Sequence, residues 1–446
     1  IYSYADRYLF QANVRHDGSS RFAKGYRWGT FPSFSAGWVA SEEKFMKNLK
    51  WDWLSFLKLR GSWGMLGNER IGSNYFPYIA LMSFGNSLFY MADGSVVSDK
   101  TARPAVLAVE DITWETTTST DLGLDVNFLN NRLQFHFDYY WKETKDMLLN
   151  IEIPYFMGYN NPSTNAGKMS THGYDIEVAW NDQIGDFKYG VNVNFSDFLS
   201  KIDYMNDGEQ ISGGKIKRAG VLFNEFYGYV CEGIYQTQEE VNNSARTSTT
   251  VTVGDLKYRD ISGPDGVPDG VISPEYDRVP LGNSLPRFQY GGSLNASYKG
   301  IDFSLAFQGI GKQNSYLSTS MVQPLRDNYS NVPAILEGKY WSPFNTTEEN
   351  LAAKYPRLSN VSKSNNYATS NFWMFNGSYF RLKNITLGYT LPKSWTQKAG
   401  INRARFYVSG SDLFCLSNFP SGWDPEMGTS DYPITTSLVM GIQVNF

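Results

Sequence analysis

The chain has 446 residues, of which 16% are aromatic and only 19% are charged, with 30 tyrosines and 12 tryptophans. Its net charge of −4 excludes the basic footprint of a nucleic-acid-binding protein, and no apolar run approaches the roughly 18 residues of a transmembrane helix. Many amphipathic rings and few charges suit a protein with much of its surface facing something other than water.

Apolar and polar residues alternate soon after the amino terminus, which is the period-two pattern of an extended strand. The first strand is expected over residues 8–15 and a returning strand over 34–38, with a polar loop between them. Residues 41–50 indicate a short helix capped by the serine that begins it, and residues 57–63 form the next expected strand. A long loop is expected from 67 to 116.

The two clearest strands follow that loop. Residues 122–128 and 133–142 alternate strictly and are joined by a tight turn at Asn130–Asn131. Another hairpin is expected to link 174–178 to 189–195. On each of these strands one face is apolar, and the opposite face carries charges and amides.

After a long interruption, two further strands meet at Lys299–Gly300, and another long loop runs to about residue 377. Three more strands complete the chain, starting near Tyr379, Arg403 and Ile434. In the first of them the alternation slips between Leu382 and Ile385, which predicts a β-bulge or a change of environment.

The final stretch, Ile434–Phe446, alternates most regularly. One face carries Leu438, Met440, Ile442, Val444 and Phe446, and the other carries Val439, Gly441, Gln443 and Asn445. The stretch ends on an aromatic residue, as the closing strand of a membrane barrel does, whereas the last residues of soluble domains usually fray into water.

These patterns predict an all-β fold, an antiparallel transmembrane β-barrel with about 12 strands in this chain. Strands of roughly 10–13 residues can cross a bilayer when tilted, and short turns alternate with long loops as in outer-membrane barrels. The alternative is a soluble β-sandwich or jelly roll, which also alternates. It is disfavoured because strands in globular domains are about half this length, and because polar residues occupy the strand centres.

Several stretches resemble the SusC/RagA family of TonB-dependent outer-membrane transporters. They are RYLFQANVRHDGSSRF, WGTFPSFSAGWVASEEKF, LKLRGSWGMLGN, WETTTSTDLGLD, NAGKMSTHGYDIE, YWSPFN, SYFRLKNITLGYTLP, RARFYVSGSDLF and the closing GIQVNF. The resemblance implies that residues 1–446 are the carboxy-terminal part of a barrel of about 22 strands. The amino-terminal plug and the first barrel half are then expected to lie outside this chain.

The resemblance also implies energised import of glycan or peptide oligomers across the outer membrane of a Gram-negative bacterium of the Bacteroidota. Its implied partners are a SusD-like surface lipoprotein that covers the barrel, the TonB complex acting through the plug, outer-membrane lipid, and a second such pair in a dimer. No cofactor is expected. The alternatives are a passive porin-like barrel, and a soluble β-rich carbohydrate-binding or adhesive protein.

Aromatic residues in the long loops are the candidate ligand contacts, because their rings can stack on sugars or on apolar side chains. The set comprises Tyr75, Tyr78, Tyr155, Tyr159, Trp341, Trp373 and Trp423, with Phe76 and Phe344 beside them. The competing interpretation, favoured for any single ring, is that it packs the loops together or faces a partner protein.

The stretch Asp260–Asp277 interleaves carboxylates with glycines, so Asp260, Asp265 and Asp269 are the candidate ligands of a calcium ion. The register of an EF-type loop fails here, because its third and fifth positions from Asp260 are a serine and a proline. Acidic turns are therefore favoured over a metal.

Catalysis has little support in the sequence. The three histidines are scattered, and no nucleophile elbow, Walker loop or HExxH motif occurs, so no enzyme is expected. Acidic strand residues such as Asp121, Asp125 and Asp138 are expected to line the water-filled lumen of the barrel. The two cysteines, Cys231 and Cys415, are expected to be unpaired and semi-buried, with a single disulfide as the alternative.

Overall fold

The computed structural model describes residues 1–49, 51–71, 75–206, 208–319, 322–327, 331–428 and 432–446. An antiparallel sheet of thirteen strands dominates them, in the order β1-β2-β3-β4-β7-β8-β9-β10-β17-β18-β21-β22-β23. No helix in these ranges is long and apolar enough to cross a membrane. The chain divides into two compact units, residues 1–179 with 197–210 and 218–222, and residues 180–196 with 211–217 and 223–446.

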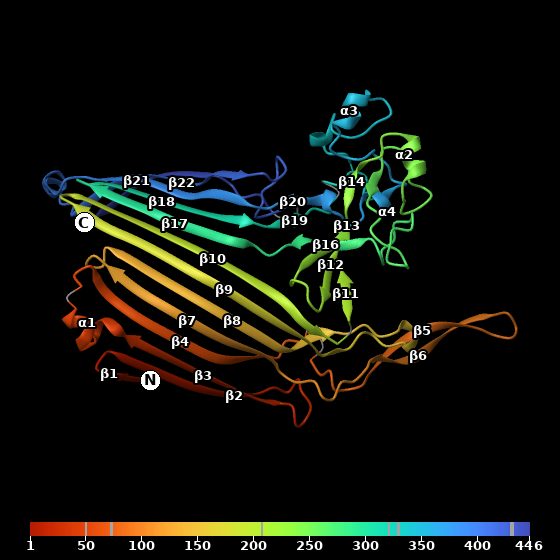
Figure 1. Ribbon diagram of the computed structural model, residues 1–446, viewed down its shortest axis with the longest axis horizontal. Helices are drawn as coiled ribbons and strands as arrows, with labels where there is room; N and C mark the ends of the chain where they lie inside the picture. Colours follow the sequence, from red (N-terminus) through yellow and green to blue (C-terminus); the bar gives the residue numbers. More distant parts are fainter. Residues whose placement is uncertain (50, 72–74, 207, 320–321, 328–330, 429–431) are drawn as a thin grey trace. The chain divides into compact units, whose positions relative to one another are not determined.

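Among the described residues, the first unit contains seven strands of the large sheet, a separate hairpin and three short helices. Figure 1 shows the strands of this unit and the β5–β6 hairpin. The sheet strands are β1 (Tyr2–Tyr4), β2 (Tyr8–Gly18), β3 (Trp28–Val39), β4 (Leu54–Asn68), β7 (Glu115–Phe128), β8 (Leu133–Asn150) and most of β9 (Ser163–Ile184). The hairpin and helices are β5 (Leu81–Tyr90), β6 (Val96–Val106), η1 (Ala40–Glu42), α1 (Lys44–Asn48) and η2 (Tyr155–Met157).

The second unit contains the remaining sheet strands and a group of shorter elements. The sheet strands are β10 (Phe187–Met205, its last residues in the first unit), β17 (Arg287–Tyr298), β18 (Ile301–Lys312), β21 (Tyr379–Thr390), β22 (Arg403–Ser417) and β23 (Ser437–Asn445). The shorter strands are β11 (Glu209–Ser212, shared with the first unit), β12 (Lys215–Arg218), β13 (Glu225–Tyr229), β14 (Cys231–Ile234), β15 (Leu256–Tyr258), β16 (Arg278–Asn283), β19 (Asn314–Tyr316) and β20 (Met374–Asn376). The helices are α2 (Gln238–Asn243), η3 (Ala334–Leu336), α3 (Thr347–Leu351), α4 (Lys363–Asn366), η4 (Asn371–Trp373), α5 (Lys393–Thr396) and η5 (Gln397–Ala399).

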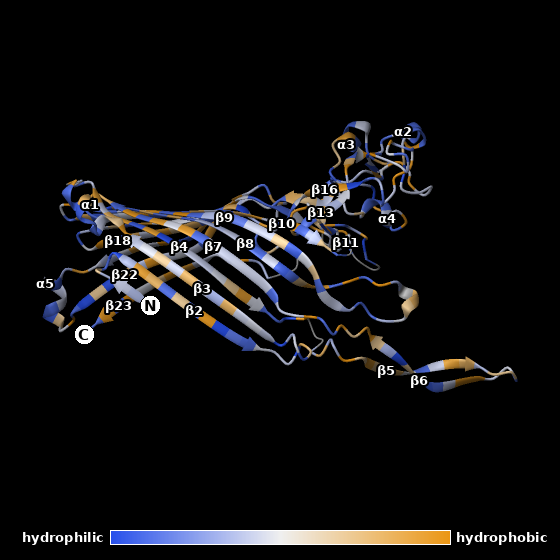
Figure 2. Ribbon diagram, turned by 60° about the horizontal axis from the view of Figure 1, so that its bottom comes forward, coloured by the Kyte–Doolittle hydropathy of each residue, from blue (hydrophilic) through white to orange (hydrophobic). Residues whose placement is uncertain are grey.

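Strand register aligns the apolar residues of neighbouring strands on one face of the sheet. Leu59 on β4 pairs with Leu124 on β7, and Leu124 pairs with Phe137 on β8. Figure 2 shows polar and apolar residues alternating along two other strands of the sheet, β2 and β3. The side chain of Leu122, on the apolar face, is 54% exposed. A sandwich would bury this leucine under a second sheet, so the sandwich alternative is wrong, and the predicted all-β antiparallel fold is confirmed.

The strands are longer than predicted in the middle of the chain. β8, β9 and β10 have 18, 22 and 19 residues, because stretches with more polar residues continue each strand beyond its apolar core. The predicted tight turn is present, since Asn130 and Asn131 adopt positive φ angles, a conformation that asparagine tolerates well.

The expected loop 67–116 was predicted wrongly as irregular, because it contains the hairpin β5–β6. The two strands pair over their full length, from Leu81 opposite Val106 to Tyr90 opposite Val96. Nearly every residue of the hairpin is exposed. Without a buried face the sequence shows no clean alternation, which explains why the strand pattern was missed.

The predicted helix 41–50 is shorter than expected and is not capped by Ser41. The segment forms one 3-10 turn and then the five-residue helix α1, whose N-cap is Glu43. The Glu43 carboxylate makes no cap hydrogen bond because it is bound elsewhere: Arg7 Nη1 donates to it at 3.0 Å, Trp38 Nε1 at 3.2 Å, and the Tyr8 hydroxyl also donates to it.

The predicted irregularity in β21 is a β-bulge. The register of β21 against β22 shifts between Leu382 and Asn384, and the register of β18 against β21 shifts at the same level. Against β18, Lys383 is the extra residue, and its Nζ donates to Asp412 Oδ1 on β22 at 2.7 Å. The bulge therefore turns a lysine toward a neighbouring strand within an otherwise alternating sheet.

Candidate functional site

The polar face of the first unit carries a charged group centred on Arg60 of β4. Arg60 Nε lies 3.2 Å from Asp125 Oδ1 on β7, and Arg60 Nη2 donates to Asp138 Oδ2 on β8 at 2.7 Å. Asp121 lies 3.7 Å from Arg60 Nη1, and His136 Nδ1 lies 3.0 Å from Asp125 Oδ1. The expected row of acids on this face is present, but its arginine partner was missed in the sequence.

Strand register explains how one arginine reaches two strands. Gly123 pairs with Arg60 on one side and with Asp138 on the other. A Cβ built on Gly123 would lie 2.5 Å from Arg60 Cζ, so the guanidinium occupies the space that a side chain would fill. Arg60 can therefore cross β7 over the glycine and pair with a carboxylate on β8.

The polar face of the second unit has its own charged group around Arg381 of β21, which is 3% exposed. Arg381 Nη2 donates to Asp424 Oδ1 and Oδ2 at 2.7 and 2.6 Å, and the guanidinium also pairs with Glu426. Gln308 Nε2 of β18 donates to Glu426 Oε2 at 3.1 Å. Both acids belong to the connection between β22 and β23, so this group fixes that connection against the sheet.

The long connections of the second unit fold into a body that we call the loop module, described for residues 223–286, 313–319, 322–327 and 331–378. Its apolar core includes Tyr229, Leu256, Tyr258 and Trp373. Most of its short helices and strands lie between these residues in the chain. The module is therefore a packed structure with its own core, although the sequence indicated only long interruptions.

A buried ionic network stabilises the loop module. Asp255 is 0% exposed, and it accepts hydrogen bonds from Arg357 Nε at 2.7 Å, Ser362 Oγ at 2.9 Å and Asn366 Nδ2 at 3.0 Å. The backbone N–H of Thr252 donates to it at 2.9 Å. Because a buried carboxylate is costly unless paired and hydrogen-bonded, this set ties the segment around Asp255 to the segment 357–366.

Burial also sets the protonation of several groups in the loop module. It raises the pKa of Tyr235 to about 12 and the pKa of the Cys231 thiol to about 11. Both groups are therefore protonated at neutral pH. Among the described residues Cys231 and Cys415 are free thiols of intermediate exposure, as expected, and the disulfide alternative is wrong.

The three predicted tryptophans lie in or against the loop module. Trp373 is 0% exposed, and its Nε1 donates to Asn366 O at 2.7 Å. Trp341 is also buried and donates to Gln236 Oε1 at 3.2 Å, and Trp423 packs against the apolar core. In this structure Trp373 and Trp341 are packing residues, the interpretation favoured for any single ring, and ligand contact by the three tryptophans stays a prediction.

The structure brings two of the predicted tyrosines together at the polar loops of the first unit. The guanidinium of Arg21 lies 4.9 Å from the Tyr75 ring centroid, and the Tyr78 hydroxyl is 3.5 Å from Ser20 O. The Phe76 ring meets Tyr78 edge-on at 6.4 Å. We call these three rings with Arg21 the aromatic cluster.

The other two predicted tyrosines lie elsewhere in the first unit. Tyr159 is partly exposed and precedes Asn160, whose N–H donates to Ala105 O at 3.0 Å. Tyr155 belongs to η2, and the position of its side chain lies outside what the structure describes. Phe344, in the second unit, is almost fully exposed. Ligand contact by these residues stays a prediction.

The carboxylates of the Asp-rich stretch are hydrogen-bonded within turns. Asp260 Oδ2 accepts from Gly270 N at 2.7 Å and Asp269 Oδ1 from Val271 N at 2.9 Å, while Asp265 is exposed. The buried Asp277 accepts from Ile261 N at 2.7 Å. In the described part of the chain, no three acidic, histidine or cysteine side chains form a group that could hold a metal ion.

A long antiparallel sheet with one apolar face and one charged face defines the wall of a transmembrane β-barrel. The model of the family described as TonB dependent receptor-like, beta-barrel, matches residues 1–409. The chain therefore belongs to the TonB-dependent receptor β-barrel family, and the protein is located in the outer membrane.

Relatives extend this assignment over the whole chain. TonB-dependent receptor P3 of Formosa agariphila is 31% identical over 100% of this chain and 44% of its own length. TonB-dependent receptor SusC of Bacteroides thetaiotaomicron is 30% identical, again over 100% of this chain and 43% of its own length. The chain thus spans less than half the length of these relatives, and both come from Bacteroidota.

A solved structure shares the fold. The structure described as that of the RagAB peptide transporter superposes with a TM-score of 0.77 over 100% of this chain and 46% of its own. Its sequence identity of 24% means that this likeness concerns the fold alone.

Proposed function

We propose that this chain forms the carboxy-terminal part of the barrel of a TonB-dependent importer that takes up glycan or peptide oligomers as nutrients. The observation that carries the proposal is that the sheet strands of each unit have lipid-compatible residues on one face and an ordered charged group on the other, around Arg60 in the first unit and Arg381 in the second. Such a wall suits an aqueous passage for hydrophilic molecules. Energy for import would come from the TonB complex acting through a plug domain, and no residue of this chain takes a catalytic role.

The aromatic cluster is the strongest candidate for ligand contact. Tyr75 and Phe76 are exposed, and the Arg21 guanidinium over Tyr75 adds hydrogen-bond donors beside an aromatic face. Rings with a polar edge suit the apolar faces of sugars as well as peptide side chains.

A SusD-like lipoprotein is the proposed partner on the loop side of the barrel. The β5–β6 hairpin supports such a partner, because Phe84, Leu88 and Tyr90 are largely exposed to solvent. An isolated two-stranded hairpin is marginally stable in water, and exposed large apolar side chains on such a hairpin suit a site of protein interaction. Two importer–lipoprotein pairs would form the dimer that the family resemblance implies.

The test uses the whole natural protein in its host, with labelled glycan and peptide oligomers and with TonB present or depleted. We expect uptake to need both TonB and the partner lipoprotein. Uptake that continues unchanged without TonB overturns the proposal in favour of a passive porin-like barrel. Tyr75→Ala with Tyr78→Ala should lower uptake, whereas Tyr276→Ala, an exposed ring in the Asp-rich turn, is the matched control.

A further inference from the structure

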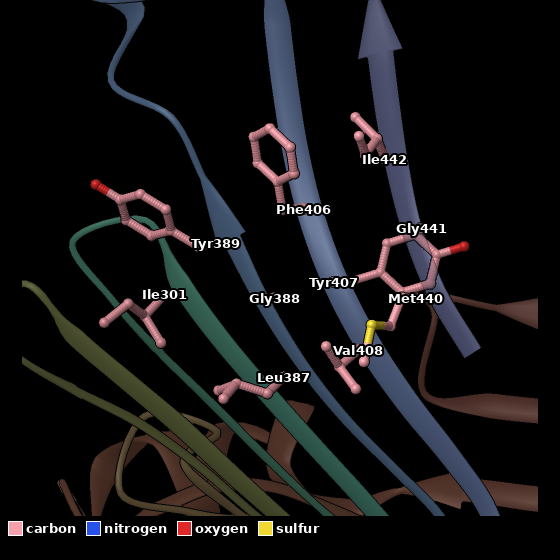
Figure 3. A pocket seen from close by; sticks show the side chains of 10 residues that line it. All are labelled: Ile301, Leu387, Gly388, Tyr389, Phe406, Tyr407, Val408, Met440, Gly441 and Ile442. Carbon is pink, nitrogen blue, oxygen red and sulfur yellow. The ribbon is translucent and has the colours of Figure 1, made fainter. Parts of the chain in front are cut away.

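A groove of about 790 Å³ lies on the apolar side of the second unit, near the ends of four neighbouring strands (Figure 3). Its walls come from Ile301 on β18, Leu387 and Tyr389 on β21, Phe406 and Val408 on β22, and Met440 on β23. Register builds it, since Leu387 pairs with Val408 and Val408 with Met440. The groove is therefore a continuous apolar channel across the sheet.

Three exposed lysines lie close in sequence to the groove residues Ile301 and Tyr389, and we call them the cationic rim: Lys299, Lys393 and Lys398. Lys299 precedes Gly300–Ile301 in the β17–β18 turn, and Thr390 N donates to Gly300 O at 2.7 Å. This bond places the turn against the end of β21, where the chain enters α5 with Lys393. Trp395 lies between the two other lysines in sequence and is 63% exposed.

Acids are scarce near the rim lysines in the sequence. No aspartate or glutamate occurs between residues 392 and 411, which contain two lysines and two arginines. Asp302, the acid nearest to Lys299 in the β17–β18 hairpin, accepts a hydrogen bond from Arg405 Nε at 2.9 Å. Since strand residues alternate between faces, Asp302 and its arginine lie on the face opposite Ile301.

The apolar groove suits the acyl chain of a phospholipid, and the lysines with the exposed tryptophan beside it suit the headgroup. Aromatic rings prefer the depth of the headgroups, and lysines near that depth attract the phosphate of anionic lipid. We propose that the groove and the cationic rim bind one anionic phospholipid, with an acyl chain along Leu387, Val408 and Met440 and its phosphate at Lys299 and Lys393. This binding is independent of the proposed transport and would hold for a passive barrel as well.

A second copy of the chain fits this face less well. Two copies in one membrane share the same orientation, so a two-fold contact would bring their rims to the same depth. The like charges of the two rims would then oppose each other, which costs free energy in an interface. A phosphate, in contrast, complements the charge of the rim.

The test is native mass spectrometry of the full-length natural protein, delipidated in mild detergent and titrated with dioleoylphosphatidylglycerol. We expect one saturable lipid, with at least a tenfold loss of affinity in the double variant Lys299→Gln and Lys393→Gln. Val408→Trp, which fills the groove, should weaken binding similarly. The control is Lys100→Gln with Lys339→Gln, two exposed lysines distant in sequence from the groove, which should leave the affinity unchanged.

Three results would overturn the proposal. Equal lipid affinity in the rim variant and the control would show that the lysines do not hold the phosphate. Displacement of the lipid by an equal concentration of soluble glycerol phosphate would indicate an anion site without a lipid chain. A change of oligomeric mass in Val408→Trp, with lipid affinity unaltered, would assign the groove to a second copy; heat-modified gel mobility checks that each variant is folded.

Discussion

Arg60 pairs with Asp138 across an intervening strand, and the path of its guanidinium passes over Gly123. This ion pair links β4, β7 and β8 on the polar face, in addition to the backbone hydrogen bonds between these strands. It makes the charged group a structural element of the wall, with three aspartates around one guanidinium. Changes at either residue, or at the glycine, are therefore expected to act together.

Gly123→Ala should destabilise the barrel by displacing the Arg60 guanidinium. The new Cβ would lie 2.5 Å from Arg60 Cζ, so the arginine must leave Asp138 or Asp125. We expect a loss of about 1–3 kcal/mol, the cost of leaving charged hydrogen-bond partners unpaired, measured by reversible urea unfolding of the whole protein in bilayers. Gly85→Ala, where a Cβ meets nothing within 4 Å, is the control; equal losses in both would contradict the role of the arginine.

The two faces of the sheet should respond differently to a new positive charge. Leu124→Arg places a cation on the apolar face near the strand centre, and we expect it to cost about 2–4 kcal/mol. Asn127→Lys, on the opposite face, should be tolerated because that face meets water. Folding yield into lipid vesicles and urea midpoints check both variants, and equal damage would argue against a wet lumen.

Sequence periodicity predicted most of the large sheet because the alternation of apolar and polar residues can be recognised within each strand alone. The alternation in 122–128 and 133–142 needs no knowledge of neighbouring strands, and even the bulge near Lys383 appears as a slip in one strand. The Arg60 group was only half predicted. Its acids follow from alternation, but the partner depends on inter-strand register, for which the glycine between two aspartates was the available signal.

The sequence could not show which aromatic loop residues are buried and which are exposed, for a different reason. Trp373 and Tyr75 both occur in long polar connections, yet one is fully buried and the other exposed. Their burial depends on contacts between distant segments, such as the pair Asp255 and Arg357, which are 102 residues apart. No local pattern encodes such a pairing, so packing rings and accessible rings look alike in the sequence.

Asp255→Asn should loosen the loop module while leaving the large sheet folded. The amide cannot accept all the hydrogen bonds that the buried carboxylate accepts, and the partly buried Arg357 loses its counter-ion. We expect a local loss of about 3 kcal/mol, seen as faster protease cleavage within 223–286 and 331–378. Asp265→Asn, at an exposed turn position, should cleave like the unaltered protein, and so serves as the control.

Cys231 should react slowly with alkylating reagents at neutral pH. Burial raises the pKa of its thiol from 9.0 to about 11, and only the thiolate reacts. At pH 8 the folded protein then holds about a hundredfold less Cys231 thiolate than an ordinary cysteine would, and the rate should keep rising with pH up to about 11. Iodoacetamide labelling of the Cys415→Ser variant measures this rate, with urea-unfolded protein as the reference. A labelling rate at pH 8 equal to the unfolded value would show that the thiol is not shielded by the loop module.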